Sequence, residues 1–134
     1  MRVDFNLVDE QVFTLLKSYM TKLDPSLTSK NFSTVENNYS STTTFPFIYI
    51  HRLPSIELAT DLERQDFNGA LLTYEIIVTS NDSQNKAKKT MNQVTAAMKS
   101  MRFSGTSLPL TSSSNNLHIV TARWERRLYG ADIL

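Results

Sequence analysis

Residues 70–101 read ALLTYEIIVTSNDSQNKAKKTMNQVTAAMKSM, and this stretch predicts a strand that is followed directly by a helix. Apolar and polar side chains alternate over Ala70–Ser80, which is typical of a strand in a sheet that is packed on one side. Asn81-Asp82-Ser83 then offers a helix N-cap. Apolar side chains recur every three or four residues from Ala87 to Met101. We therefore expect this helix to cover one face of the sheet.

The N-terminal part of the chain predicts another helix. Apolar side chains recur at intervals of three and four residues between Val8 and Leu23, which indicates one buried helix face. We expect the helix over Asp9–Leu23, with Asp9 as its N-cap. Asp24-Pro25 should end it, because the residue before a proline is disfavoured in the helical region.

Two further strands are predicted from their aromatic and β-branched residues, over Phe45–Leu53 and over Leu117–Tyr129. Between the central helix and the final strand, Gly105 is a C-cap signal for that helix. We expect a short extended piece at Ser107–Leu110 and then a turn at Thr111–Asn116.

Two polar segments interrupt this pattern. Residues 25–44 are rich in Ser, Thr and Asn, and are expected to form a loop or an irregular edge strand from about Asn31. Residues 54–69 are expected to form a long connector loop, and loops of this length are usually functional or mobile. Residues 1–134 then make a single α+β domain, with a mainly antiparallel sheet and two helices packed on one face.

The composition argues against most enzymes. The chain of 134 residues has no cysteine, which excludes disulfides, thiolate nucleophiles and cysteine metal sites. Its three glycines do not form a phosphate-binding or dinucleotide motif, and no G-x-S-x-G is present. His51 and His118 lie in strand-like runs, which favours structural roles for both. We therefore predict no catalytic residue, no cofactor and no metal.

Charge is distributed unevenly along the chain. Residues 1–67 hold six Lys/Arg and nine Asp/Glu, whereas residues 68–134 hold eight and four. Acids gather over Glu57–Asp66, and bases gather over Lys86–Arg102. Opposite patches let copies attract head to tail, and a non-isologous contact that closes makes a ring. The alternative is two solvated faces of no consequence. A glycosidase-type carboxylate pair is disfavoured, because these acids share one expected loop.

The basic residues also raise the possibility of nucleic-acid binding, because phosphates are bound by such clusters. The residues concerned are Lys86, Lys88, Lys89, Lys99, Arg102, Arg123, Arg126 and Arg127. The chain lacks helix-turn-helix spacing and the ribonucleoprotein aromatic motif, so a solvated or protein-facing basic helix is favoured. Met91, Met98 and Met101 are accounted for by packing in the core or at a subunit interface.

Three stretches carry a resemblance that covers most of the chain, from about Phe45 to Tyr129. They are LATDLERQDFNGALLTYEIIVTSND (58–82), KAKKTMNQVTAAMKSMRFSG (86–105) and LHIVTARWERRLYG (117–130). The elements occur in a fixed order: an aromatic strand, an acidic connector, a YEIIVTS-type strand, an alanine- and methionine-rich helix, and a terminal strand with Ala-Arg-aromatic. This order resembles the tail terminator (tail completion, head-tail joining) proteins of long-tailed bacteriophages.

The resemblance implies a structural virion protein without catalytic activity. Its copies would form a homo-oligomeric ring, hexameric in that family, which ends polymerisation of the tail tube and offers a docking surface to the head or neck. The implied partners are other copies of the chain, the tail tube protein and a head-completion or neck protein. Genome DNA would pass through the ring without specific binding. Another neck component, such as a head-completion or connector protein, is the nearest alternative, and a cytoplasmic nucleic-acid-binding module is a more distant one.

The same resemblance places the protein in the virion, assembled in the host cytoplasm. No signal-like apolar run opens the sequence and no stretch approaches the ~20 apolar residues that span a bilayer, so no membrane partner is expected. The candidate residues for a subunit interface or a channel lumen are Glu57, Asp61, Glu63, Arg64, Asp66, Lys86, Lys89, Lys99, Arg123, Arg126 and Arg127.

Overall fold

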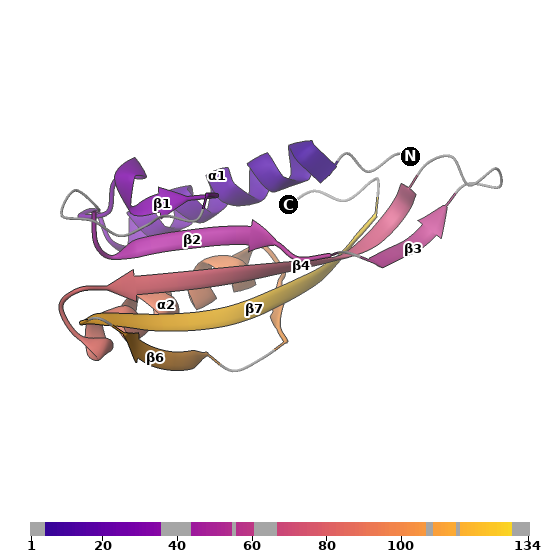
Figure 1. The fold of residues 1–134 in the computed structure, drawn as a ribbon. Coiled ribbons are helices and arrows are strands. Elements are labelled where there is room, and N and C mark those ends of the chain that lie inside the picture. The colour runs from indigo at the N-terminus through magenta and orange to yellow at the C-terminus, as the bar shows by residue number, and fades with distance from the viewer. Residues whose placement is uncertain are drawn as a thin grey trace.

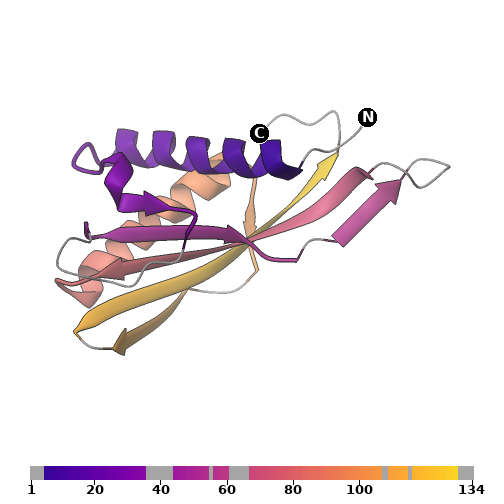
Figure 2. The ribbon, with the colours of Figure 1, turned by 45° about the horizontal axis from the view of Figure 1, so that its top comes forward.

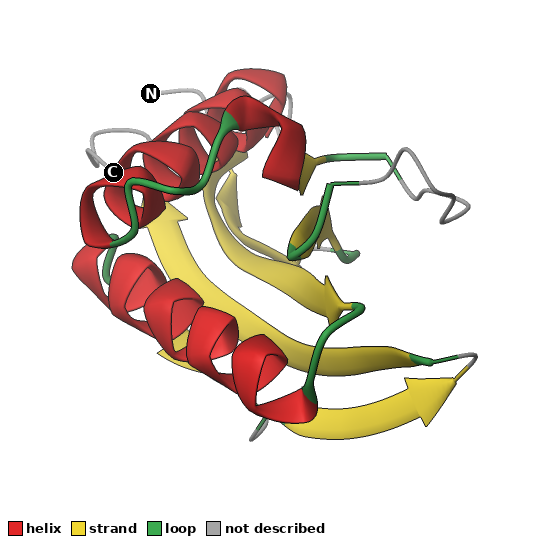
Figure 3. Cartoon of the chain, turned by 90° about the vertical axis from the view of Figure 1, so that its left-hand side faces the viewer, coloured by secondary structure: helices red, strands yellow, loops and turns green. Residues whose placement is uncertain are grey.

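Two α-helices lie next to each other on one face of a curved sheet (Figures 1 and 3). The computed structural model describes residues 5–35, 44–54, 56–60, 67–106, 109–114 and 116–129. Within these residues the helices are α1 (Phe5–Leu23) and α2 (Gln84–Ser100). The sheet is mixed and mostly antiparallel, so the predicted α+β class and the placing of both helices are confirmed.

The sheet has seven strands, and its central order is β1-β2-β4-β7-β5. Of the described pairs, only β1–β2 is parallel. Two short strands lie off this path, because β3 pairs with β4 and β6 pairs with β7. The bounds are β1 Phe32–Ser33, β2 Phe47–Arg52, β3 Ile56–Thr60, β4 Phe67–Ser80, β5 Ser104–Gly105, β6 Leu110–Ser114 and β7 Leu117–Tyr129.

The core lies between the helices and the sheet. Leu72, Tyr74, Ile76 and Val78 of β4 alternate with half-buried neighbours and face the helices, as the period-two pattern predicts. The other core side chains come from α1, α2, β2, β7 and the segments between them, among them Val12, Leu16, Met91, Val94, Met98, Met101, Val120, Ala122 and Trp124. The methionines of α2 therefore belong to the core.

The first helix begins earlier than predicted, and it ends at Leu23, as Asp24-Pro25 predicts. It begins at Phe5, so Asp9 lies inside it and is not its N-cap. The buried stripe runs through Val8, Val12, Leu16 and Met20 at intervals of four, whereas Leu23 is half exposed at the last position. The carboxylate of Asp9 is paired with side chains of the sheet instead.

Two segments that were expected to be loops contain strands. β3 occupies Ile56–Thr60 within the expected connector 54–69, and β4 begins at Phe67. Likewise Leu110–Ser114 forms β6, so only the end of the expected turn at Thr111–Asn116 is a turn. In both places a long neighbouring strand offers unpaired backbone N–H and C=O groups. Hydrogen bonding to these groups favours a strand although the sequence pattern predicts a loop. Residues 55, 61–66, 107–108 and 115 lie outside the described residues.

The end of α2 also differs from its prediction. Met101 is the C-cap, and Arg102 follows with a φ of 66°. The amide of Phe103 donates to the carbonyl of Met98, and the amide of Arg102 donates to that of Lys99, which is a Schellman motif. Gly105 lies in β5 and does not cap the helix.

Candidate functional site

Charged side chains cross three strands on the sheet face that no described helix covers. His51, Glu75 and Arg123 lie opposite one another on β2, β4 and β7. His51 Nε2 lies 2.8 Å from Glu75 Oε1, and Arg123 Nε donates to Glu75 Oε2 at 3.0 Å. The Glu75 carboxylate is thus held between two basic side chains.

The pKa of Glu75 reflects this position. Burial of the carboxylate would raise its pKa, but the hydrogen bonds from His51 and Arg123 outweigh burial, so the pKa lies below its ordinary value. Tyr49 stacks on the His51 ring with centroids 4.9 Å apart, which fixes the imidazole over the sheet. The cluster is satisfied within the chain, which supports the structural role expected for His51.

A second polar cluster lies on the helix side of the same strands. Arg52 Nε donates to Asp9 Oδ1 of α1 at 3.1 Å, and the hydroxyl of Tyr74 donates to the same oxygen. Burial and the Asp9 carboxylate raise the pKa of Tyr74, so its phenol keeps its proton. A cavity of about 240 Å³ beside these groups is lined by Phe13, Ile50 and others. The pairs join α1 to the sheet.

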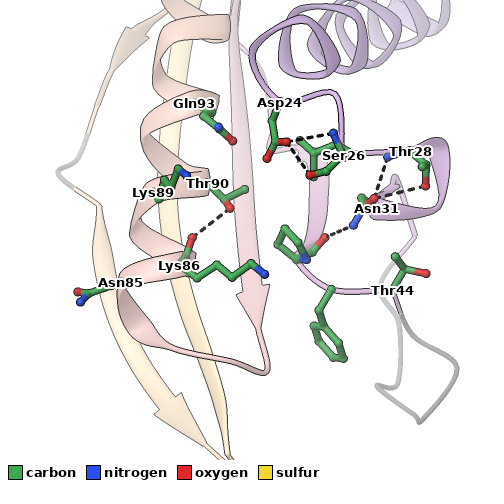
Figure 4. Close-up of a pocket in the computed structure, with 13 residues that line it drawn as sticks. Asp24, Ser26, Thr28, Asn31, Thr44, Asn85, Lys86, Lys89, Thr90 and Gln93 are labelled. Atoms are coloured by element: carbon green, nitrogen blue, oxygen red, sulfur yellow. Dashed lines mark hydrogen bonds between the residues drawn. The ribbon is translucent and has the colours of Figure 1, made fainter.

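A larger cleft of about 530 Å³ separates the N-terminal half of α2 from the segment that follows α1 (Figure 4). One wall carries Lys86, Lys89, Thr90 and Gln93 of α2. The other wall is formed by residues 24–31 and 44–46, which include the apolar side chains Leu27, Phe45 and Pro46.

The wall opposite α2 is held by hydrogen bonds among its own residues. Thr28 caps the short 3-10 helix Ser29–Asn31, and its amide donates to Asn31 Oδ1 at 2.9 Å. The side chain of Asn31 is buried, and its Nδ2 donates to the carbonyl of Pro46 at 2.8 Å. Part of the Ser/Thr/Asn-rich segment 25–44 therefore forms a fixed wall of the cleft, and its edge strand begins at Phe32, close to the predicted position.

The cleft brings charges of both signs together. Lys86 points into the gap and Asp24 points toward α2 from the other side (Figure 4). The Ser26 hydroxyl and amide donate to Asp24, which lowers its pKa against the opposing effect of burial, and Lys89 contributes to the lowering. Lys86 Nζ is 3.9 Å from Asp82 Oδ2, and both side chains are at least half exposed, so this pair is weak.

The structure separates the predicted basic residues into different environments. Lys86 and Lys89 line the cleft, while Lys99 lies exposed near the far end of α2. Arg123 is bound to Glu75, and Arg127 is exposed on the same sheet face. Arg126 is buried and donates to the carbonyl of Met101, so it stabilises the end of α2 and does not form part of an exposed surface.

The predicted acidic residues belong to the β3–β4 hairpin. Glu57 lies in β3, and its backbone pairs with Ala70, but its side chain lies outside what the structure describes. Asp61, Glu63, Arg64 and Asp66 lie in the segment 61–66, outside the described residues.

Sequence patterns did not identify Asp9, Asp24 or Glu75 as members of polar clusters. Glu75 and Arg123 are on the same predicted sheet, but only the strand register shows that they lie opposite each other. Asp24 was interpreted as a helix terminator, and its position across from Lys89 depends on the packing of α1 against α2.

A scan of protein-family models finds no match to this chain, and no curated protein matches it. Among the described residues, no helix is long and apolar enough to cross a membrane. In the same part of the chain, no three His, Asp or Glu side chains are grouped so that they could hold a metal ion.

Proposed function

We propose that this chain is a tail terminator protein of a long-tailed bacteriophage. Its copies form a ring on the end of the tail tube, with six subunits as in the family that it resembles. The ring ends tube polymerisation and presents a surface to which the head or neck attaches. Genome DNA passes through it without specific contacts, and the protein is a structural part of the virion.

The order of the elements carries this proposal. The aromatic strand β2, the long strand β4, the alanine- and methionine-rich helix α2 and the terminal strand β7 follow one another as the resemblance implies. Both helices cover one sheet face, so the other face is left with half-buried apolar residues, among them Ile77 and Ile119, beside the Glu75 cluster. A face of this kind suits contacts with neighbouring subunits.

Nucleic-acid binding by α2 is less well supported. Successive residues of a helix are about 100° apart, so Lys88 lies about 200° around the helix from Lys86. Lys86 and Lys89 line the cleft, whereas Lys88 and Lys99 are exposed away from it. The bases do not form a single stripe that follows a phosphate backbone. Tight DNA binding by the monomer in a gel-shift at moderate salt would favour this alternative.

Electron microscopy of phage tails made without this protein tests the proposal. Overlong tubes without heads are expected, because nothing then stops tube polymerisation. Tails of normal length without heads would point to a head-completion or connector protein. Normal particles, or purified virions that lack the protein, would contradict a structural role in the virion.

A further inference from the structure

The cleft beside α2 combines apolar and basic side chains. The wall opposite α2 carries the apolar side chains of Leu27, Phe45 and Pro46, and two lysines stand on the α2 wall. A short segment with carboxylates next to an apolar side chain satisfies both features, because the carboxylates pair with ammonium groups while the apolar group is buried. Residues 61–66 of this chain read DLERQD, with Leu62 between Asp61 and Glu63.

Other segments of this chain fit the cleft less well. Residues 36–43 read ENNYSSTT with one acid, and residues 130–134 read GADIL with one acid. The segment 61–66 holds three acids and one arginine, and Glu57 precedes it on β3. Charge complementarity with Lys86 and Lys89 therefore favours residues 61–66.

Residues 61–66 cannot reach the cleft of their own chain. They are joined to Thr60 and Phe67, at the end of the sheet where β3 pairs with β4 (Figures 1 and 2). The cleft lies at the other end of β4, where Ser80 leads into α2 and Phe47 pairs with Thr79. Phe67 and Thr79 are twelve residues apart on one strand, which at ~3.2 Å per residue is about 38 Å along the strand. A loop of six residues extends no more than about 12 Å beyond its anchors.

We propose that the cleft binds residues 61–66 of a second copy of this chain. Asp61 and Glu63 of one copy pair with Lys86 and Lys89 of the next, and Leu62 is buried against the apolar side chains of the opposite wall. The contact joins opposite ends of the molecule, and in a head-to-tail arrangement it repeats from copy to copy until a ring closes. The cleft and the charges are the observations that support this contact. It rests on the proposed function only in that it would be the subunit interface of the proposed ring.

Charge reversal on each side of the contact provides the test. The K86E/K89E variant has an acidic cleft and an acidic segment, and the D61K/E63K variant has a basic cleft and a basic segment. Each variant alone should lose the self-association that sedimentation velocity measures up to millimolar protein. An equimolar mixture should regain it, because each segment then meets a cleft of opposite charge. The chain that carries all four substitutions should also associate.

Matched controls separate this contact from a general effect of charge. The K88E/K99E variant has the same change in charge as K86E/K89E but alters exposed lysines outside the cleft. It should associate like the wild type. Circular dichroism should show unchanged thermal unfolding for both lysine variants, since the four replaced lysines are exposed. Wild-type association should weaken at least tenfold as salt rises, because exposed pairs are screened.

A covalent trap follows from the absence of cysteine in the chain. The E63C and K89C variants, mixed under oxidising conditions, should form a disulfide between chains, whereas E63C with K99C should not. Loss of stability without loss of association in K86E/K89E would show that a segment of the same chain covers the cleft. Wild-type protein that stays monomeric at millimolar concentration and gives no trapped dimer would overturn the proposal.

These results are independent of the phage assignment. Restored association in the mixture would support the contact even if tails formed without the protein proved normal. Overlong tubes together with association that is indifferent to both reversals would support the tail terminator and reject this contact. In that outcome the acids of residues 57–66 would be left for the channel lumen, where they repel phosphates.

Discussion

Adjacent residues of the central strands serve opposite faces of the sheet. Tyr74 points toward the helices and is bonded to Asp9 of α1, while Glu75 points away and is held by His51 and Arg123. On β2, Arg52 and His51 divide in the same way. Because strand side chains alternate, two pairs of consecutive residues, Tyr74-Glu75 on β4 and His51-Arg52 on β2, contribute to separate polar clusters on the two faces of the sheet.

The Glu75 cluster should make stability depend on pH. The pKa of Glu75 is lower in the folded chain than in the unfolded chain, so its contribution is present above the unfolded pKa and is lost as pH falls through the folded pKa. We expect Glu75→Gln to lower the free energy of unfolding by about 1–2 kcal/mol at pH 7, because Arg123 is half exposed and screened. Urea unfolding from pH 7 down to pH 3 measures the difference.

The difference between wild type and Glu75→Gln should shrink as pH falls from the ordinary glutamate pKa of about 4.3 through the lower pKa of the folded chain. Asp82→Asn is the matched control, because the Asp82 side chain is exposed and its ion pair with Lys86 is weak. A constant difference between the variant and wild type at every pH would show that shape, and not charge, is what Glu75 provides.

The side chains of helix α2 lie in three different environments. Ala87, Met91, Val94 and Met98 face the core, Lys86 and Lys89 line the cleft, and Lys88 and Lys99 are exposed. Its end is fixed by the Schellman motif and by the bond from Arg126 to the Met101 carbonyl. The motif requires a left-handed residue, and Arg102 takes that conformation at φ 66°.

Replacing Arg102 by glycine should stabilise the protein. A left-handed conformation costs a non-glycine residue about 1–2 kcal/mol, and the greater freedom of glycine in the unfolded chain offsets part of the gain. We expect a net gain of about 0.5–1 kcal/mol in the free energy of unfolding, measured by urea denaturation. Arg102→Ala keeps the strained backbone and should give no gain. Equal stabilisation by both variants would mean that the arginine charge is the unfavourable feature.

Helices and strands with a regular spacing of apolar residues could be predicted from the sequence. Strands that form only because a neighbouring strand offers backbone hydrogen-bonding groups could not. The alternation of Ala70–Ser80 and the stripe of α2 predicted both elements to within a few residues, because burial of one face determines them. β6 is polar and β3 is only five residues long, so neither carries a clear period, and both are defined by pairing with the edges of β7 and β4. Lys86 and Lys89 were predicted as candidates, but the cleft depends on how residues 24–31 fold back toward α2.

The molecule as a whole has two different ends. At one end of β4 lies the β3 hairpin, whose connecting segment is acidic, and at the other end lies the cleft with its two lysines. Two antiparallel copies that exchange segments use both ends in a two-fold dimer, whereas a head-to-tail contact uses them in a closed ring or an open filament. The number of subunits in the assembly distinguishes the ring that we propose from the dimer.

Mixing the two charge-reversal variants should therefore show whether the number of subunits in the ring is even. In an equimolar mixture of K86E/K89E and D61K/E63K, each subunit accepts only the other variant as its neighbour. The two must alternate, so a closed ring can hold only an even number of subunits with equal shares of both. Native mass spectrometry should show three copies of each variant if the ring is hexameric. Rings with an odd number of subunits, or with unequal shares, would contradict a contact in which each segment enters the cleft of its neighbour.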